Sequence, residues 1–270
     1  CGESATGIGN TYVGDSAALT GSSGNANTAF GAVSLGALTT GASNTAVGYN
    51  SMVSNTTGEN NIAMRYASLD ANTTASNNVA LGYVALGANT TGAENIAIGK
   101  GALDANTTAD SNIGIGNNAL GVNTTGTANV AVGAAALDAN TTADHNTAVG
   151  YKALTTQNSS DGAGQNTAIG YEAGKLVTTG IHNTLIGNEA GDALTIATRN
   201  VAIGSRALSS EDVGDRSIAI GFSALSQQNS DSNNETAGNI GIGVEAGFYN
   251  VTGQYNTFLG YQAGFGSSGD

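Results

Sequence analysis

One motif recurs along the entire chain at a nearly fixed 17-residue interval. Aligning the sequence on the glycine that closes each Asn-x-Ala-[Ile/Val]-Gly motif gives fifteen units, in one of which an arginine replaces the glycine. Twelve of the fourteen intervals between these anchor residues span 17 positions, and the other two span 20 and 22. A unit this short cannot bury a core alone, so we expect the units to stack on one another. The anchors are Gly14, Gly31, Gly48, Arg65, Gly82, Gly99, Gly116, Gly133, Gly150, Gly170, Gly187, Gly204, Gly221, Gly243 and Gly260.

An asparagine stands four residues before the anchor in fourteen of the fifteen units, and Ser217 is the exception. In a stack of β-coils such a column forms a ladder of side-chain amides, spaced by the strand separation of about 4.8 Å. The predicted structural ladder comprises Asn10, Asn27, Asn44, Asn61, Asn78, Asn95, Asn112, Asn129, Asn146, Asn166, Asn183, Asn200, Asn239 and Asn256.

The residues next to the anchor alternate as they do in a β-strand. The third residue before it is β-branched and the residue directly before it is apolar, so these two side chains share one face. Glycine and asparagine at the corners permit the positive φ angles of tight turns, and no proline interrupts the chain. The sequence therefore predicts an all-β fold, a parallel β-solenoid (β-roll) of about fifteen 17-residue coils. We expect one continuous repeat array over residues 1–270, with longer loops near 155–165 and 226–238.

Each coil is predicted to supply its own core side chain. The fourth residue after the anchor is mostly leucine, as in Leu69, Leu103, Leu137 and Leu208. Where Gly174, Gly191, Gly247 or Gly264 takes that place, a bulky residue follows, and the predicted replacements are Leu176, Leu194, Phe248 and Phe265.

Alanine occupies the other face of nearly every strand, as in Ala29, Ala46 and Ala202. Strands that are apolar on both faces are usually buried on both. We therefore expect the alanine rows to pack against other copies of the chain, with a homotrimer as the first hypothesis. The terminal units are as regular as the central ones, which favours either a piece of a longer fibre or an end-to-end filament.

Several units resemble repeats of known fibrous proteins. NIAIGKGAL (95–103), NTAIGYEAG (166–174) and SIAIGFSAL (217–225) are similar to the head repeats of YadA-like trimeric autotransporter adhesins, and NTFLGYQAG (256–264) resembles repeats of phage-type tail-fibre proteins. The resemblance implies a trimeric, surface-exposed β-roll that works in attachment. The adhesin repeat is usually shorter than the repeat of this chain, which shows no coiled-coil stalk, membrane anchor or chaperone domain.

The charge and cysteine content exclude several classes of protein. Twenty acidic residues against seven basic ones give a net charge of −13, which disfavours nucleic acid as a partner. No apolar run is long enough to span a membrane. Cys1 is the only cysteine, so neither a disulfide nor a cysteine metal site is expected, although Cys1 is a candidate lipid-bearing residue of a processed lipoprotein. We expect the protein at the outside of a cell or at a virion surface.

No catalytic, metal or cofactor site is predicted. His145 and His182 fall at turn positions, where a solvated histidine is the simplest interpretation. Asp70, Asp104 and Asp138 recur at one turn position, but the calcium-binding β-roll pattern of glycines and aspartate is absent. We expect the protein not to be an enzyme.

An aromatic residue follows the anchor in seven units and forms a candidate stripe for stacking on carbohydrate or on another subunit. Its members are Tyr49, Tyr66, Tyr83, Tyr151, Tyr171, Phe222 and Tyr261. The two longer loops are candidates for contact with a surface receptor.

The repeated stretch ALDANTTAD leaves three interpretations of Asn-Thr-Thr open: an architectural turn, an N-glycosylation site and a threonine ladder for ice. The candidate glycosylation sites are Asn55, Asn72, Asn89, Asn106, Asn123 and Asn140. The leading hypothesis is a non-enzymatic extracellular fibre or filament protein that self-associates and works in attachment. The alternative is an ice-binding β-solenoid, although adjacent threonines of a strand would point to opposite sides.

Overall fold

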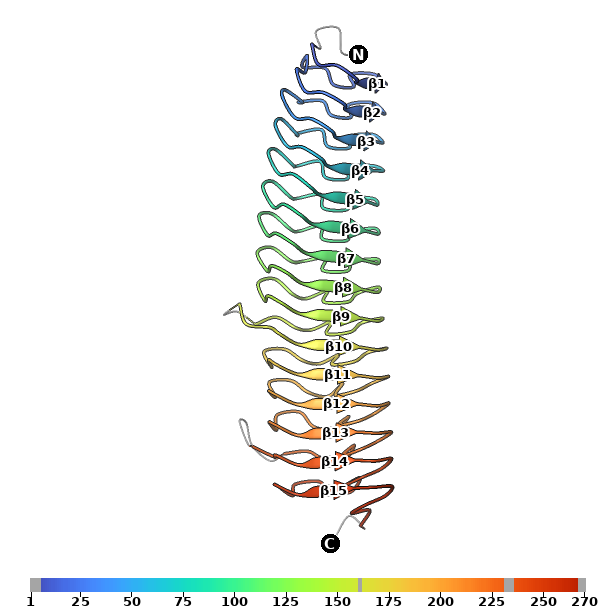
Figure 1. Ribbon diagram of the computed structural model, residues 1–270, viewed down its shortest axis with the longest axis vertical. Coiled ribbons are helices and arrows are strands. Elements are labelled where there is room, and N and C mark those ends of the chain that lie inside the picture. Colours follow the sequence, from blue (N-terminus) through green and yellow to red (C-terminus); the bar gives the residue numbers. More distant parts are fainter. Residues whose placement is uncertain (1–5, 160–161, 231–235, 267–270) are drawn as a thin grey trace. The chain divides into compact units, whose positions relative to one another are not determined.

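The computed structural model describes residues 6–159, 162–230 and 236–266, and Figure 1 shows their path. The chain divides into two compact units, unit 1 over Cys1–Asn129 and unit 2 over Val130–Asp270. Both units consist of three-residue strands joined by turns, and the described residues contain no helix. The predicted fold class, an all-β parallel solenoid built from repeated 17-residue coils, is confirmed.

Unit 1 stacks seven strands in the order of the chain. Each strand pairs in parallel with the next, and the paired residues are 17 positions apart, as in Ala63 with Ala80. The strands are β1 (Thr11–Val13), β2 (Thr28–Phe30), β3 (Thr45–Val47), β4 (Ile62–Met64), β5 (Val79–Leu81), β6 (Ile96–Ile98) and β7 (Ile113–Ile115).

Unit 2 repeats this arrangement with eight strands. Its longer coils keep the strand register, because Thr147 still pairs with Thr167 and Ile218 with Ile240. The additional residues therefore leave the coils as loops, of which residues 160–161 and 231–235 are not described. The strands are β8 (Val130–Val132), β9 (Thr147–Val149), β10 (Thr167–Ile169), β11 (Thr184–Ile186), β12 (Val201–Ile203), β13 (Ile218–Ile220), β14 (Ile240–Ile242) and β15 (Thr257–Leu259).

The alanine row of each unit lies inside the coils, so the prediction that it faces another chain is wrong. Ala46, Ala80 and Ala202 have no exposed surface. Where the preceding corner carries leucine, only a small side chain fits beneath the strand, since a Cβ on Gly114 would already lie 3.2 Å from Leu103 Cγ. The β-branched and apolar residues on either side of the alanine therefore point outward.

The leucines four residues after the anchor fill the core as predicted. Leu69, Leu103, Leu137 and Leu208 are completely buried. These leucines adopt left-handed backbone angles, with φ of 51–54°, so the corners are not restricted to glycine and asparagine. The left-handed region costs a leucine about 1–2 kcal/mol, and stacking of the coils must offset that cost.

Two of the four predicted replacements for this leucine are wrong. Leu176 is 45% exposed and Phe265 is 42% exposed, whereas Leu194 is buried and Phe248 is half-buried. In these coils the space beside the glycines is filled from the strand instead, by Leu185 of β11 and by Phe258 of β15. Val177, one residue beyond Leu176, is completely buried.

Candidate functional site

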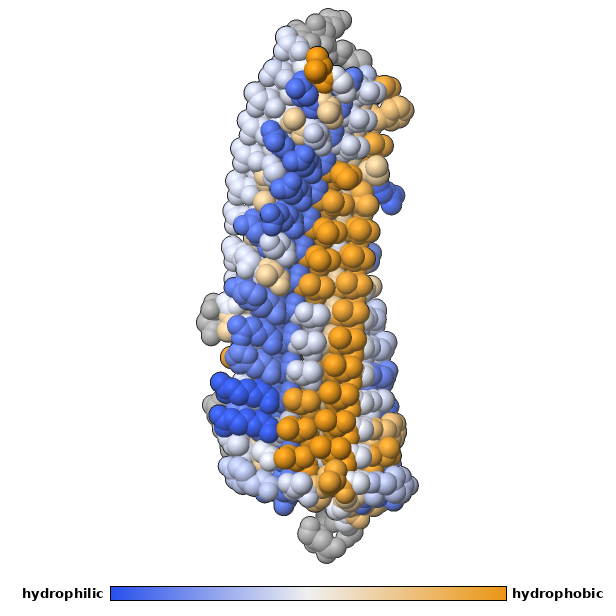
Figure 2. Space-filling view, in the orientation of Figure 1, coloured by the Kyte–Doolittle hydropathy of each residue, from blue (hydrophilic) through white to orange (hydrophobic). Residues whose placement is uncertain are grey.

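The outward side chains of the strands form an exposed apolar surface on each unit, which we call the outer apolar face. Two residues of every strand contribute to it, and each is half-buried or exposed. Figure 2 shows this face as adjacent rows of hydrophobic residues. In unit 1 it comprises Thr11, Val13, Thr28, Phe30, Thr45, Val47, Ile62, Met64, Val79, Leu81, Ile96, Ile98, Ile113 and Ile115. In unit 2 it comprises Val130, Val132, Thr147, Val149, Thr167, Ile169, Thr184, Ile186, Val201, Ile203, Ile218, Ile220, Ile240, Ile242, Thr257 and Leu259.

No charged residue interrupts the outer apolar face of either unit. Phe30 is 58% exposed, and Met64 and Ile169 are each 40% exposed. Monomeric soluble proteins rarely expose contiguous apolar patches larger than a few hundred Å². Each unit thus carries one unbroken apolar row beside a row of isoleucine, valine and threonine, and such a sheet face has the character of an interface.

The asparagine column forms a side-chain ladder within each unit. In unit 1, Asn61 Oδ1 accepts a hydrogen bond from the Asn78 backbone N at 2.9 Å, while Asn61 Nδ2 donates to the Ala75 carbonyl at 2.8 Å. Similar bonds recur in unit 2, where Asn200 Oδ1 accepts from the Ser217 N at 2.8 Å. The column lies between the strand and the preceding turn, and it joins successive coils by bonds that are shielded from water.

The Asn-Thr-Thr segments form a second buried ladder, which the sequence interpretation missed. Asn55, Asn72, Asn89, Asn106, Asn123 and Asn140 have no exposed surface. Asn72 Nδ2 donates to Asn55 Oδ1 at 2.8 Å and to the Ala75 carbonyl at 3.1 Å. A glycan needs the same nitrogen and open space around it. The folded coil provides neither, so the structure argues against glycosylation and supports the turn interpretation.

The two threonines of each Asn-Thr-Thr segment differ in hydrogen bonding and exposure. The first hydroxyl of each pair bonds to the neighbouring coil, as Thr73 Oγ1 does to the Thr90 carbonyl at 3.2 Å and Thr90 Oγ1 to the Thr107 carbonyl at 3.0 Å. The second threonine is exposed at Thr57, Thr74, Thr91 and Thr108. A two-row threonine surface for ice is therefore not formed here, because one row is committed to the coil.

Tyrosines of the aromatic stripe stack on one another. The ring centroids of Tyr49 and Tyr66 are 5.7 Å apart, and those of Tyr66 and Tyr83 are 5.2 Å apart with an interplanar angle of 10°. In unit 2, Tyr151 and Tyr171 stack at 5.6 Å. Because the ring faces cover each other, Tyr66 has no free face for a sugar. The arrangement favours the structural or interface interpretation of the stripe over carbohydrate stacking.

A buried carboxylate replaces the second asparagine ladder in one coil of unit 2. Glu211 is completely buried and accepts hydrogen bonds from the Gly214 N at 2.7 Å and from Gln228 Nε2 at 2.8 Å. Ser230 Oγ also donates to Glu211 at 3.0 Å, so this network holds the start of the second long loop. Gln228 Nε2 bonds Ser217 as well, at 2.9 Å, and so compensates for the one asparagine missing from the first ladder.

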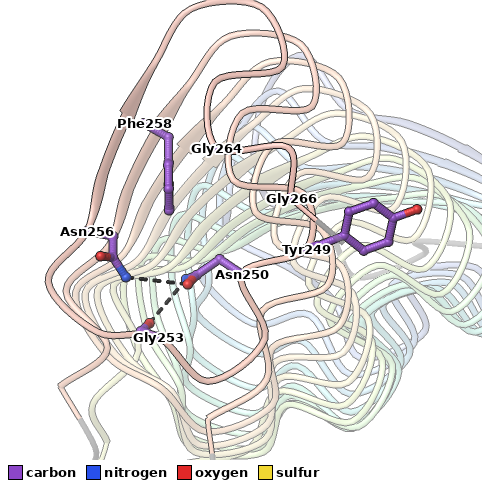
Figure 3. A pocket seen from close by; sticks show the side chains of 7 residues that line it. All are labelled: Tyr249, Asn250, Gly253, Asn256, Phe258, Gly264 and Gly266. Carbon is purple, nitrogen blue, oxygen red and sulfur yellow. Dashed lines mark hydrogen bonds between the residues drawn. The ribbon is translucent and has the colours of Figure 1, made fainter. Parts of the chain in front are cut away.

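Cavities are found at two places in unit 2. One of about 300 Å³ lies at the last coil and is lined by Asn250, Asn256 and Phe258, among others. Figure 3 shows Asn250 and Asn256 turned toward each other and Tyr249 pointing away. The other, of about 330 Å³, contains the ion pair between Arg206 Nε and Glu189 Oε2 at 2.9 Å. Neither cavity brings together groups with the geometry of a catalytic site.

The recurrent aspartates and the histidines are not gathered into a metal site. Burial raises the pKa of the Asp70, Asp104 and Asp138 carboxyls because it disfavours their charged form. His145 and His182 are exposed at turns. Within the described ranges no three His, Cys, Asp or Glu residues are placed to hold a metal ion.

Cys1 lies outside the described residues. The described part of the chain contains no helix with the length and apolarity needed to cross a bilayer.

These features define a class of protein: a parallel β-solenoid repeat protein with an exposed apolar sheet face. Comparison of the chain with protein-family models, curated proteins and solved structures gives no match.

Proposed function

We propose that the chain is a non-enzymatic structural segment of an extracellular fibre or filament that works in surface attachment. The observation that carries this proposal is the outer apolar face. A row of apolar side chains that stays half-buried or exposed on every strand is costly in water, since apolar burial stabilises by about 25 cal/mol per Å². Association of several chains through this face removes that cost.

The proposed assembly is a homotrimer in which the outer apolar faces enclose a common core. The faces are flat on the scale of one strand and uncharged, and they repeat with the regular coil spacing. Each coil of one copy thus meets equivalent residues of its neighbour. Repeated identical contacts suit a closed ring of parallel chains better than a contact at a single site.

Surface location and attachment are supported by the resemblance of units such as NTAIGYEAG (166–174) to adhesin head repeats and tail-fibre repeats. In this proposal the β-solenoid is the rigid scaffold and the two long loops of unit 2 are the contact points for a receptor or carbohydrate.

The test is the mass of the purified chain in solution, measured by analytical ultracentrifugation. We expect three times the chain mass for the wild type and the monomer mass for Ile98→Lys, which places a charge in the outer apolar face. Thr91→Lys, on an exposed turn of the preceding coil, is the matched control and should remain trimeric. A wild-type monomer with ice-growth inhibition would overturn the proposal and favour the ice-binding alternative.

A further inference from the structure

Charged residues of unit 1 flank the outer apolar face on opposite edges. One edge consists of the residues that precede each strand, and the other consists of the anchor position and the residue after it. The first edge includes Glu59 and Glu94 and has no basic residue. The second edge carries Arg65 and Lys100, the only two basic residues of unit 1, and one acid, Asp15 after β1. Figure 2 shows hydrophilic residues on both sides of the hydrophobic rows.

The two glutamates and the two basic residues belong to the same coils. Glu59 precedes β4 and Arg65 follows it, while Glu94 precedes β6 and Lys100 follows it. All four side chains are exposed. The members of each pair lie beyond opposite ends of a strand, more than about 10 Å apart, so they cannot pair within one chain.

None of these four residues forms an ion pair with a described residue. The two ion pairs formed by the described part of the chain, Lys175 with Glu172 and Arg206 with Glu189, both lie in unit 2. Glu94 only accepts a long hydrogen bond of 3.4 Å from Ser111 Oγ, across to the next coil. At both β4 and β6, a glutamate on one edge and a basic residue on the other thus belong to the same coil. Neither has an ion-pair partner among the described residues.

We propose that neighbouring copies pack side by side with their coils in register, so that Glu59 and Glu94 of one copy pair with Arg65 and Lys100 of the next. This inference rests on the proposed self-association through the outer apolar face and specifies its geometry. In a ring of parallel chains, one edge of each sheet meets the opposite edge of its neighbour. Coils at equal height then bring a glutamate and a base together at β4 and again at β6.

The same charges favour equal heights over the adjacent registers, in which only Asp110, three residues before β7, can meet Lys100. A shift of one coil places each glutamate beside the edge of β3, β5 or β7, which carries glycine with tyrosine or asparagine. The apolar rows alone do not distinguish these registers, because every coil presents similar residues. An unmatched charge beside an apolar interface is unfavourable, and the pairs therefore favour the equal-height contact that a closed ring requires over the shifted contacts of an open assembly.

Zero-length carbodiimide coupling tests the contact in the native protein. The reagent activates a carboxylate, and a lysine amine in direct contact displaces it to form an amide bond. Equal amounts of unlabelled and ¹⁵N-labelled chain are assembled together and coupled, and the linked peptides are identified by mass spectrometry. We expect a Glu94–Lys100 link with mixed labels, which must join two copies. Lys100→Arg should keep the assembly and lose the link.

Charge reversal tests the energetic role of the pairs. We expect Glu94→Lys to weaken assembly by roughly tenfold or more in Kd, because it sets two lysines against each other. The swapped variant Glu94→Lys/Lys100→Glu should restore assembly. Thr57→Lys/Thr91→Lys, which adds the same charge on exposed turns, is the control and should assemble like the wild type.

The outcomes separate the inference from the proposed function. A wild type that assembles, but gives no mixed-label link and tolerates Glu94→Lys, overturns the in-register pairing and leaves self-association standing. A wild type that remains monomeric overturns both. A face-to-face pair of antiparallel copies would give a stable dimer without the link, and it too would overturn the inference.

Discussion

Leu185 occupies the space that a side chain on Gly174 would need: its Cδ1 lies 2.6 Å from the position that a Cβ of Gly174 would take. Gly191 lies in the same coil as Leu185, and the position that a Cβ of Gly191 would take is 2.7 Å from Leu185 Cδ2. The coil thus holds a constant volume of apolar side chain. Where the strand supplies a leucine instead of alanine, the two neighbouring corners supply glycine.

This relationship predicts a coupled pair of substitutions. Gly174→Leu restores the usual corner residue but overfills the core, and it should destabilise the protein by about 1–3 kcal/mol. Leu185→Ala alone should cost about 2–5 kcal/mol through the cavity that it leaves. The double variant should lose less than the sum, as measured by urea denaturation followed by circular dichroism. Gly174→Leu combined with Leu69→Ala, in unit 1, should be additive, and equal additivity in both pairs would contradict the packing argument.

The repeat length made the solenoid predictable, but it left the inside and outside of the strand undetermined. A period of two separates the residues of a strand into two sets and does not say which set is buried when both are apolar. The deciding quantity is the width of the coil, which a local pattern does not contain. One signal was present in the sequence: Leu185 and Phe258, two of the three large residues on the alanine side, coincide with glycines at the adjacent corners, and the third, Tyr12, lies in the first strand.

The buried asparagines were predictable as a column only where they belong to the strand motif. For Asn72 and its equivalents the sequence left a turn, a glycosylation site and a threonine ladder open, because a sequon and a buried ladder use the same residue type. Their burial depends on the turn closing back over the core, which follows from the stacking of several coils. The replacement of one of them by Glu211, with Gln228 and Ser230 as partners, could not be inferred from a single unit.

The first asparagine ladder should contribute strongly to stability. Asn61→Ala removes the acceptor of the buried Asn78 N, whereas the Ala75 carbonyl keeps its second donor, Asn72 Nδ2. An unsatisfied buried N–H costs about 1–3 kcal/mol, so we expect a loss of about 1–3 kcal/mol in the free energy of unfolding. Thr57→Ala, at an exposed turn of the preceding coil, should change it by less than about 0.5 kcal/mol. A small effect of Asn61→Ala in urea denaturation would show that water replaces the ladder.

Asp104 should make the protein less stable as the pH rises. Burial raises the pKa of its carboxyl in the folded state, so the folded state holds this proton more tightly than the unfolded state. Stability therefore falls as the pH rises through the folded-state pKa, and the loss is complete above it. Asp104→Asn should stabilise the protein at pH 7, and its advantage should shrink as the pH falls toward the ordinary aspartate pKa.

The measurement for Asp104 is the unfolding temperature of both proteins between pH 3 and pH 8. Thr108→Ala is the control because Thr108 is exposed in the turn that follows Asp104 and carries no titrating group. It should give nearly parallel curves. An Asp104→Asn advantage that grows toward low pH would have the wrong sign and would contradict the role of burial.

The stacked tyrosines should act as a stabilising ladder rather than as a sugar platform. Tyr66 lies between Tyr49 and Tyr83, with centroids 5.7 and 5.2 Å away, so Tyr66→Ala breaks two aromatic contacts. Each contact is worth about 0.5–1.5 kcal/mol, and we expect a loss of about 1–3 kcal/mol in the free energy of unfolding. Tyr261→Ala is the control, since Tyr261 is 73% exposed and stacks on no ring in the described part of the chain. It should have little effect. If Tyr66→Ala left the unfolding midpoint unchanged but abolished retention on an immobilised glycan array, the stripe would be a carbohydrate site after all.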